Sequence, residues 1–272
     1  MARDPVVGPV SLQFQPPPGS TLVQQRVGED PVAISNPLVV ILAGGRGSRL
    51  AEETQGLVPK PMIQVGGMPM LEHIMRAYSA QGMRRFIIAT GFMGNVIGDW
   101  VHNNDHLYAD EIKAVDTGLD TQTGGRLLRL AELLRGGSFM LTYGDGFADV
   151  NLKMLLDHHK NTRLVATLTA VHPPARFGNL VIDGPLATRF NEKSQTQTDW
   201  INGGFYVLEP SILDLIPGDE CRLEYDVLPS LAVQGRVAAY RHPGFFQMID
   251  NWRDLQLIKQ MWQNGDAPWK RW

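Results

Sequence analysis

The 272-residue sequence contains one cysteine, Cys221, which excludes an internal disulfide framework. Scarcity of cysteine is typical of a protein in a reducing compartment. Long hydrophobic runs are also missing, since no stretch approaches the roughly 20 apolar residues that a membrane-spanning helix needs. The first residues lack the apolar centre of a signal peptide. We therefore expect a cytoplasmic protein with no membrane partner.

Positive charge is in short supply as well. The 25 Lys and Arg residues are outnumbered by 28 Asp and Glu residues, and no basic run is longer than a pair. Wrapping of a nucleic acid depends on clustered cations that neutralise its phosphates. We therefore expect no nucleic-acid partner. The hydrophobic share of 43% is ordinary for a globular chain, and the length suits one large α/β domain or two small ones.

Residues 1–36 differ in composition from the rest of the chain. They contain three consecutive prolines, and their apolar pieces, such as 10–14, are short. This composition is typical of a segment that buries too little apolar surface to fold alone. We expect a flexible or loosely docked N-terminal extension over 1–36 and a folded domain over 37–272. Pairing of 10–14 or 20–27 as an added edge strand is the alternative.

The most informative stretch is residues 38–62, LVVILAGGRGSRLAEETQGLVPKPM. Its first five residues are apolar, and such a run before glycines is typical of a buried parallel strand. Glycines directly after a strand let backbone N–H groups wrap an anion, because no Cβ blocks the approach. Arg46, Arg49 and Lys60 supply the positive charge that a polyphosphate requires. The stretch predicts a phosphate-binding loop, with a plain strand-to-helix turn as the alternative.

Two common nucleotide-binding patterns are missing from this loop. The dinucleotide pattern G-x-G-x-x-G would need glycine at position 50, where Leu50 stands, and the P-loop pattern G-x-x-x-x-G-K-[ST] does not occur. No strained nucleophile turn marks a Ser-His-Asp set. With a single cysteine, a thiolate zinc site is not expected. The loop thus predicts phosphate chemistry of another kind.

Apolar runs and helical periodicity alternate along the chain after the loop. Expected strands are 83–90, 138–143, 163–171, 179–182, 187–191, 203–208 and 237–240. Expected helices are 70–81, 91–100, 126–134, 152–159, 224–234 and 253–263. The segment 103–125 is largely polar. Strand–helix alternation predicts one α/β domain with a mainly parallel sheet and a second half rich in strands.

Two carboxylates are candidates for a magnesium site. Asp145 lies between two glycines after an apolar run, where ligands of open α/β sheets bind. Mg²⁺ takes one or two protein carboxylates together with substrate phosphates, and Asp250, just before the last predicted helix, is the second candidate. The alternatives are a plain turn residue at Asp145 and helix capping by Asp250 or Asn251.

A polar group follows in the second half. Glu192 and Lys193 come after an apolar strand, and Asn202 precedes Gly203 and another strand. A carboxylate, an ammonium and an amide near one strand end can hydrogen-bond the hydroxyls and phosphate of a sugar phosphate. A surface ion pair and a turn are the alternative.

Taken together, these motifs resemble a known family. LAGGRGSRL followed by PKPM is similar to the signature of the sugar-1-phosphate nucleotidyltransferases, L-A-G-G-x-G-[ST]-R-L and P-K-P. VDTG, TGGRL, TYGDGFAD, HPPARFGNL, INGGFYVL and HPGFFQMID further resemble the branch that uses CTP and glucose 1-phosphate. The resemblance extends from about residue 38 to the end of the chain.

The resemblance implies a fold and a reaction. The implied fold is Rossmann-like, with three layers, a mostly parallel mixed sheet and a strand-rich sugar-binding half. The implied enzyme converts CTP and glucose 1-phosphate into CDP-glucose and pyrophosphate with Mg²⁺, and is a homo-oligomer. The same chemistry on another sugar or polyol phosphate, or with another nucleotide, is an alternative. A non-catalytic protein that binds nucleotide sugars is a further one.

Individual residues match the family's functional positions. On the nucleotide side these are Leu42, Gly44, Gly45, Gly47, Ser48, Arg49, Lys60, Gly124, Gly125, Arg126 and Asp145. The resemblance implies that Arg49 and Lys60 are catalytic and that Asp145 and Asp250 bind Mg²⁺. On the sugar-phosphate side the matching residues are Gly178, Glu192, Lys193, Asn202 and Gly203.

Overall fold

The structure is a computed structural model that describes residues 36–47, 50, 56, 58–104, 106–173, 179–191 and 200–272. The predicted extension falls almost wholly outside these residues, so the domain boundary at residue 37 stays a prediction. Among the helices that are described, none is long and apolar enough to cross a membrane.

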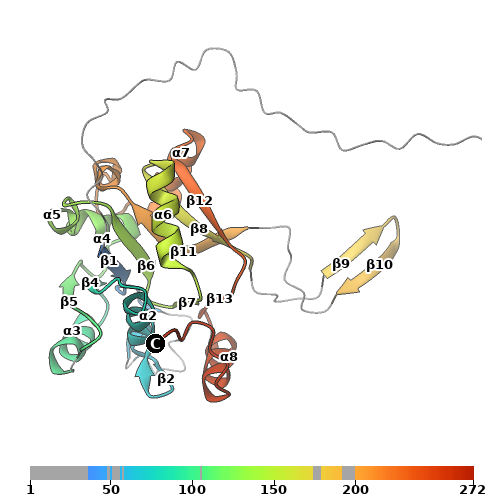
Figure 1. Ribbon diagram of the computed structural model, residues 1–272, viewed down its shortest axis with the longest axis horizontal. Coiled ribbons are helices and arrows are strands. Elements are labelled where there is room, and N and C mark those ends of the chain that lie inside the picture. Colours follow the sequence, from blue (N-terminus) through green and yellow to red (C-terminus); the bar gives the residue numbers. More distant parts are fainter. Residues whose placement is uncertain are drawn as a thin grey trace, which may run out of the picture. The chain divides into compact units, whose positions relative to one another are not determined.

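A seven-stranded sheet forms the centre of the domain (Figure 1). In spatial order its strands are β12 (Val237–His242), β8 (Ala166–Val171), β11 (Ile201–Leu208), β6 (Phe139–Tyr143), β1 (Leu38–Leu42), β4 (Arg85–Thr90) and β5 (Glu111–Asp116). Neighbouring strands run parallel except where β11 pairs antiparallel with β6 and β8. The predicted mostly parallel mixed sheet is confirmed, and its antiparallel strand comes from the second half of the chain.

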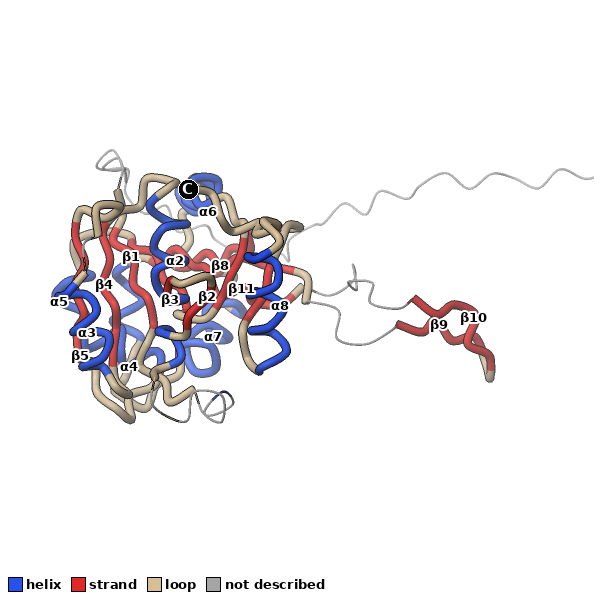
Figure 2. The backbone as a smooth tube through the Cα atoms, turned by 90° about the horizontal axis from the view of Figure 1, so that it is seen from below, coloured by secondary structure: helices blue, strands red, loops and turns tan. Residues whose placement is uncertain are grey.

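Helices cover both faces of the sheet, and Figure 2 shows α2 and α6 on one side and α4 and α7 on the other. One face carries α2 (Met70–Ser79), α3 (Gly94–Asn103) and α6 (Leu152–Thr162), and the other carries α4 (Thr123–Arg129), α5 (Ala131–Leu134) and α7 (Leu228–Val233). Val39 and Ile41 of β1 pack into the first apolar cluster, whereas Val40 and Leu42 pack into the second. Because side chains alternate across a strand, a central strand covered on both faces is apolar throughout.

Shorter elements complete the fold. They are the η2 turn of 3₁₀-helix (Lys60–Met62), β2 (Gln64–Val65), β3 (Met68–Pro69), β7 (Gly146–Ala148), β9 (Asn179–Asp183), β10 (Leu186–Asn191), η3 (Pro210–Leu215), the π-helix η4 (Leu223–Val227), β13 (Phe246–Met248) and α8 (Trp252–Gln263). β9 and β10 form an antiparallel hairpin, as do β2 and β3, while β13 pairs antiparallel with β7.

Three expected elements differ from those observed. The segment 103–125, described from the sequence only as largely polar, contains the edge strand β5, in which Ile112 and Ala114 alternate with charged residues. A half-exposed edge strand has this alternation instead of an apolar run. The helix expected over 126–134 begins at Thr123 and is interrupted at Leu130. The helix expected over 224–234 begins as a π-helix.

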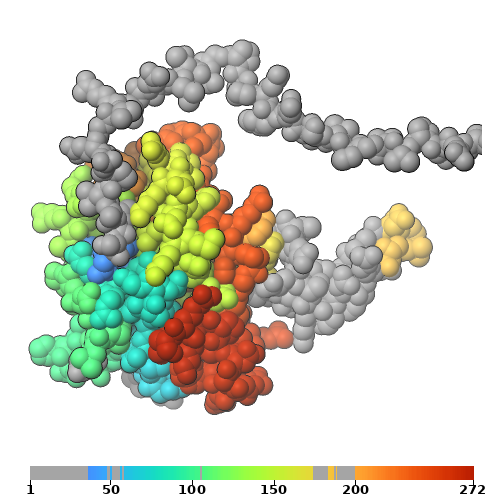
Figure 3. Space-filling model, in the orientation of Figure 1, coloured from blue at the N-terminus to red at the C-terminus, as the bar shows by residue number. Residues whose placement is uncertain are grey.

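The C-terminal segment packs against α2 and β2, and Figure 3 shows its red atoms against the cyan surface. The buried indole N–H of Trp269 donates to Nδ1 of His73 at 3.3 Å. The other ring nitrogen of His73, Nε2, lies 2.8 Å from the carbonyl oxygen of Val65. A carbonyl only accepts, so Nε2 carries the proton and the imidazole is neutral. His73 therefore connects α2, β2 and the C-terminal segment.

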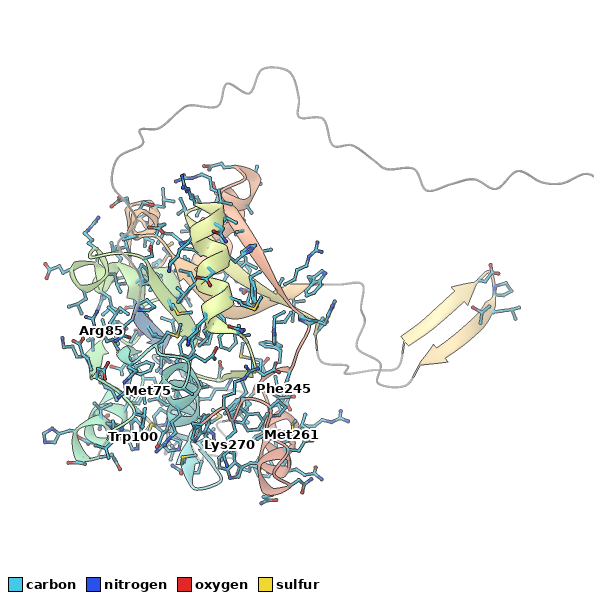
Figure 4. The ribbon with its side chains drawn as sticks, in the orientation of Figure 1. Met75, Arg85, Trp100, Phe245, Met261 and Lys270 are labelled. Atoms are coloured by element: carbon cyan, nitrogen blue, oxygen red, sulfur yellow. The ribbon has the colours of Figure 1, made fainter. Side chains whose placement is uncertain are left out.

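Aromatic rings surround this histidine. Phe147, Trp262, Trp269 and Trp272 all have ring centroids within 6.3 Å of the imidazole. Around them lie Phe245, Met261 and Lys270, which Figure 4 labels, and the Lys270 ammonium lies 4.7 Å from the Trp262 ring centroid. This third apolar cluster joins α8 and the C-terminal segment to the rest of the domain.

Burial of His73 predicts a loss of stability in mild acid. Desolvation lowers its pKa below the 6.5 of an exposed imidazole, more than the Val65 carbonyl and Glu72 raise it, and Arg76 and Lys270 lower it further. The unfolded chain therefore takes up a proton at a higher pH than the folded one. The free energy of unfolding should decrease as the pH falls below about 6.5.

Urea denaturation of the wild type and of His73→Asn at about pH 7.5 and about pH 5 measures this effect. The variant should be less stable at the higher pH, because it loses the bonds to Trp269 and Val65. The difference in stability between the two proteins should narrow at the lower pH, since asparagine does not titrate. A difference that stays constant with pH would contradict this assignment.

Candidate active site

A cavity of about 340 Å³ opens at the carboxyl ends of β1 and β6, the position where open α/β sheets bind ligands. Five parts of the chain contribute to its wall. The lining residues are Leu42, Ala43, Gly44, Gly45, Gly47, Lys60, Pro61, Thr121, Gln122, Thr123, Arg126, Tyr143, Gly144, Asp145 and Asp250. The cavity thus brings the glycine loop together with Lys60, Arg126 and both predicted metal-binding carboxylates.

Lys60 lies between the two carboxylates. Its Nζ is 2.7 Å from Oδ2 of Asp145 and 3.7 Å from Oδ1 of Asp250. All three side chains are largely buried, with exposed fractions of 13%, 23% and 27% in the same order. Partial burial strengthens attraction between opposite charges, because less water screens them. The site therefore holds a compact group of one cation and two anions.

Pairing of β7 with β13 brings the two aspartates together. Gly146 pairs with Met248, and the N–H of Ile249 donates to the carbonyl of Asp145 at 3.0 Å. Each aspartate thus lies just outside one end of the same short ladder. This ladder joins residues far apart in the sequence, and neither strand was expected from the sequence.

Asp250 is not the N-cap of α8. The cap is Asn251, whose side chain accepts from the N–H of Asp254 at 3.1 Å. The N–H of Asp250 donates to Oδ2 of Asp254 at 3.0 Å. Capping by Asn251 leaves the Asp250 carboxylate directed at the Lys60 ammonium.

Arg126 fixes the backbone around the glycine loop. Its Nη1 donates to the carbonyls of Thr90 and Gly118 at 2.8 and 2.9 Å and to the Thr117 hydroxyl at 2.7 Å, and its Nη2 donates to the Gly44 carbonyl at 3.1 Å. Gly44 follows β1, Thr90 is the last residue of β4, and Thr117 and Gly118 follow β5. Burial lowers the pKa of Arg126, more than Asp116 raises it, although a guanidinium stays protonated in proteins. One charged group therefore connects three strand ends.

Two loop positions require glycine. A Cβ on Gly44 would lie 2.1 Å from Nη1 of Arg126. Gly47 has φ +59°, which favours glycine, and a Cβ there would lie 3.0 Å from Cβ of Lys60. The loop is therefore packed tightly against both cations.

Gly124 and Gly125 pack against the segment that contains Asp219 and Cys221. Their N–H groups donate to the carbonyl of Cys221 at 2.9 and 3.2 Å, and a Cβ on Gly125 would lie 2.4 Å from the carbonyl oxygen of Asp219. The residues just before them, Thr121 to Thr123, line the cavity instead. The sequence patterns assigned these three residues no individual role, although Thr123 begins the TGGRL motif.

Asn202 and Gly203 lie at the start of β11 and are not among the lining residues. Oδ1 of Asn202 accepts from the N–H of Gly204 at 3.0 Å, and its amide donates to the Tyr206 hydroxyl. Gly203 packs closely on Val171, since a Cβ there would lie 2.7 Å from Cγ1 of Val171.

The remaining predicted site residues are Ser48, Arg49, Gly178, Glu192 and Lys193, and they lie outside the described residues. Their roles stay predictions.

The donor set at Asp145 and Asp250 fits a hard cation. The Lys60 ammonium stands between the two carboxylates as a positive charge. Among the described residues, no group of three or more His, Cys, Asp or Glu residues could hold a metal by itself. A cation here would therefore take further oxygen ligands from a bound phosphate or water, as Mg²⁺ does.

Comparisons with known proteins agree with this geometry. The sequence model of the family described as nucleotidyl transferase matches residues 38–267. The chain is 43% identical over 254 residues to glucose-1-phosphate cytidylyltransferase of Salmonella typhi, covering 86% of this chain and 98% of that protein. It is 36% identical to a probable glucose-1-phosphate cytidylyltransferase of Bacillus subtilis, over 86% of this chain and 99% of the relative.

A solved structure shares the fold. HddC from Yersinia pseudotuberculosis matches with a TM-score of 0.68 and 25% identity, covering 83% of this chain and 99% of HddC. Another structure of HddC, complexed with GMP-PN, matches with a TM-score of 0.66.

Proposed function

Because the chain belongs to the nucleotidyl transferase family, we propose that it transfers a cytidylyl group from CTP to glucose 1-phosphate. The products are CDP-glucose and pyrophosphate. The observation that supports this most is the meeting of Lys60, Asp145 and Asp250 at one cavity beside the glycine loop. Identity of 43% to a named glucose-1-phosphate cytidylyltransferase supports the choice of substrates.

The reaction is an in-line displacement at phosphorus. A phosphate oxygen of glucose 1-phosphate attacks the α-phosphorus of CTP and forms a new P–O bond. The bond from the α-phosphorus to the oxygen that bridges to the β-phosphate breaks, and pyrophosphate leaves with that electron pair. The attacking phosphate is already ionised near neutral pH, so no general base is needed. Catalysis then rests on positioning two anions and neutralising their charge.

The residues of the cavity suit these tasks. Backbone N–H groups of Gly44, Gly45 and Gly47 would hold the triphosphate, with Ser48 and Arg49 continuing the same loop. Lys60 would move from the carboxylates toward phosphate oxygens. Arg126 would keep the loop in shape from behind, through its bond to the Gly44 carbonyl. Gly178, Glu192, Lys193, Asn202 and Gly203 would form the side that binds glucose 1-phosphate.

We assign Asp145 and Asp250 to the binding of Mg²⁺, which neutralises charge on the triphosphate when bound. A non-catalytic protein that binds nucleotide sugars has no need of two carboxylates and a lysine at the reacting phosphates. We also propose a cytoplasmic homo-oligomer whose domain spans residues 37–272. The family match over 38–267 supports that span.

Pyrophosphate release measured over four nucleoside triphosphates and several sugar 1-phosphates tests the function. We expect the highest kcat/KM for CTP with glucose 1-phosphate. If another pair reacts equally fast, the proposed substrates are wrong. If no pair reacts, the catalytic proposal is wrong.

Replacing Lys60 with methionine should raise the KM for CTP about tenfold, the scale of one charge-assisted hydrogen bond. Methionine keeps most of the length of the side chain but removes the ammonium that faces the phosphates. Initial rates at varied CTP measure the effect. Lys153→Met, on the exposed face of α6, is the matched control. An unchanged KM for CTP in Lys60→Met would contradict the role of Lys60.

A further inference from the structure

A connected set of polar side chains links the cavity wall to Asn202. It centres on Glu224 of the π-helix η4, whose Oε2 accepts from the Thr123 hydroxyl at 2.6 Å and whose Oε1 accepts from the Tyr143 hydroxyl at 2.5 Å. Tyr143 and Thr123 line the cavity. The Tyr206 hydroxyl lies 2.8 Å from that of Tyr143 and also accepts from the amide of Asn202. We call this set the Glu224 network.

Only one assignment of donors and acceptors is consistent with the hydrogen bonds of the network. Tyr143 has a single hydroxyl proton, and it goes to Glu224, so Tyr206 must donate to Tyr143. The hydroxyl oxygen of Tyr206 is then an acceptor for Asn202. On the other side, Thr123 donates to Glu224 and accepts from the N–H of Leu223 at 2.9 Å. The bond from Thr123 and the chain of bonds from Asn202 through Tyr206 and Tyr143 therefore end on the same carboxylate. We call them the two arms of the network.

Burial keeps both tyrosine hydroxyls protonated and their hydrogen bonds in place. Tyr206 is fully buried, and desolvation, more than any neighbour, raises its pKa to about 12. Burial likewise raises the pKa of Tyr143, as do Tyr206 and Glu224. Both phenols therefore stay protonated and keep their donor roles at neutral pH. A buried hydroxyl without its partner is unfavourable, so the network resists rearrangement.

The network fixes the orientation of Asn202. Its Oδ1 is held by the N–H of Gly204 and its amide nitrogen by Tyr206, so the amide cannot rotate without losing both bonds. The residue is nevertheless exposed, and its second amide N–H can meet a phosphate or a hydroxyl. Asn202 is thus an oriented donor on the proposed sugar-phosphate side.

We infer that Glu224 is a positioning residue that fixes the nucleotide side and the sugar-phosphate side of the site relative to each other. Through Thr123 it fixes the wall beside the nucleotide, and through Tyr143 and Tyr206 it fixes Asn202. This inference rests on the proposed function, because it takes Asn202 to contact glucose 1-phosphate. A π-helical turn at a functional position is a recurring device in other proteins.

Tyr206→Phe isolates one arm of the network. Tyr206 is fully buried, so it touches no substrate, and phenylalanine keeps its ring in the core. We expect the KM for glucose 1-phosphate to rise about fivefold, on the scale of one hydrogen bond, with the KM for CTP unchanged. Tyr240→Phe, a partly buried tyrosine on β12, is the matched control and should change neither KM.

Glu224→Ala removes the point where the arms meet, and it should raise both KM values. Glu224→Gln keeps one carbonyl acceptor and should restore part of the loss. Adding Tyr206→Phe to Glu224→Ala should raise the KM for glucose 1-phosphate little further, because both changes interrupt the same arm. If circular dichroism shows that Glu224→Ala does not fold, the KM values of Tyr206→Phe still test the inference.

Two results would overturn the inference: a Tyr206→Phe protein that has both KM values raised equally, or one that has neither raised. The wild type in the same assay separates this inference from the proposed function. If the wild type does not use CTP with glucose 1-phosphate, that function is wrong, and the variants are then measured with the pair that the substrate panel identifies. An active wild type with an unaffected Tyr206→Phe variant contradicts the network alone.

Discussion

Replacing Asp145 with asparagine should lower kcat by roughly a hundredfold or more, the scale of losing a principal electrostatic stabiliser. The carboxylate lies 2.7 Å from the Lys60 ammonium and lines the cavity. Asparagine has nearly the same shape, so the change removes one negative charge with little loss of packing. Without that charge the proposed metal site would hold Mg²⁺ more weakly and would position Lys60 less well. Pyrophosphate release at saturating substrates measures kcat.

Asp214→Asn is the matched control for this variant. Asp214 is a surface carboxylate in η3, paired with Arg135 at 3.0 Å, and it does not line the cavity. Surface ion pairs contribute little, so its kcat should stay near that of the wild type. Near-normal turnover in Asp145→Asn would remove Asp145 from the proposed metal site.

Replacing Arg126 with lysine should have the second largest effect. A single ammonium cannot reach the carbonyls of Thr90, Gly118 and Gly44 at once, as the planar guanidinium does. We expect the free energy of unfolding to fall by about 3 kcal/mol, because buried acceptors lose a charged donor. The KM for CTP should also rise, by about tenfold, because the glycine loop loses its support.

Chemical denaturation and initial rates at varied CTP measure the two effects separately. Arg135→Lys is the matched control, since Arg135 is exposed and pairs with the surface carboxylate of Asp214. A variant that keeps wild-type stability but binds CTP poorly would show that Arg126 acts on the nucleotide directly. A variant that is unchanged in both respects would contradict the described role of Arg126.

Local patterns predicted much of this fold. The apolar run of β1 and the glycines after it indicated a buried parallel strand and a phosphate loop, because both features depend on neighbouring residues. Helical periodicity located α2, α6 and α8 within a few residues. The edge strand β5 was missed, because its alternating pattern also fits a polar loop. The two-stranded ladder of β7 and β13 was missed because strands of three residues are too short to show an alternating pattern of apolar and polar residues.

Residue types alone could not assign all the side chains of the site. Arg126 was predicted on the nucleotide side, and it does line the cavity, yet its guanidinium bonds three strand ends. Gly124 and Gly125 were predicted beside the nucleotide, and they pack on the segment at Cys221. In both cases the sequence indicates the neighbourhood of the site, whereas the contact made depends on which segment folds against it.

The sequence by itself determined the chemistry of this protein: a glycine loop with cations, two candidate carboxylates, and the family that combines them. Those features are local, or they belong to a motif that the family shares. Only the tertiary structure decided how they act together. Pairing of β7 with β13 brings Asp145 and Asp250 to Lys60, and the Glu224 network joins Thr123 to Asn202. Such contacts join residues far apart in the chain, and no local pattern encodes which distant partner a side chain meets.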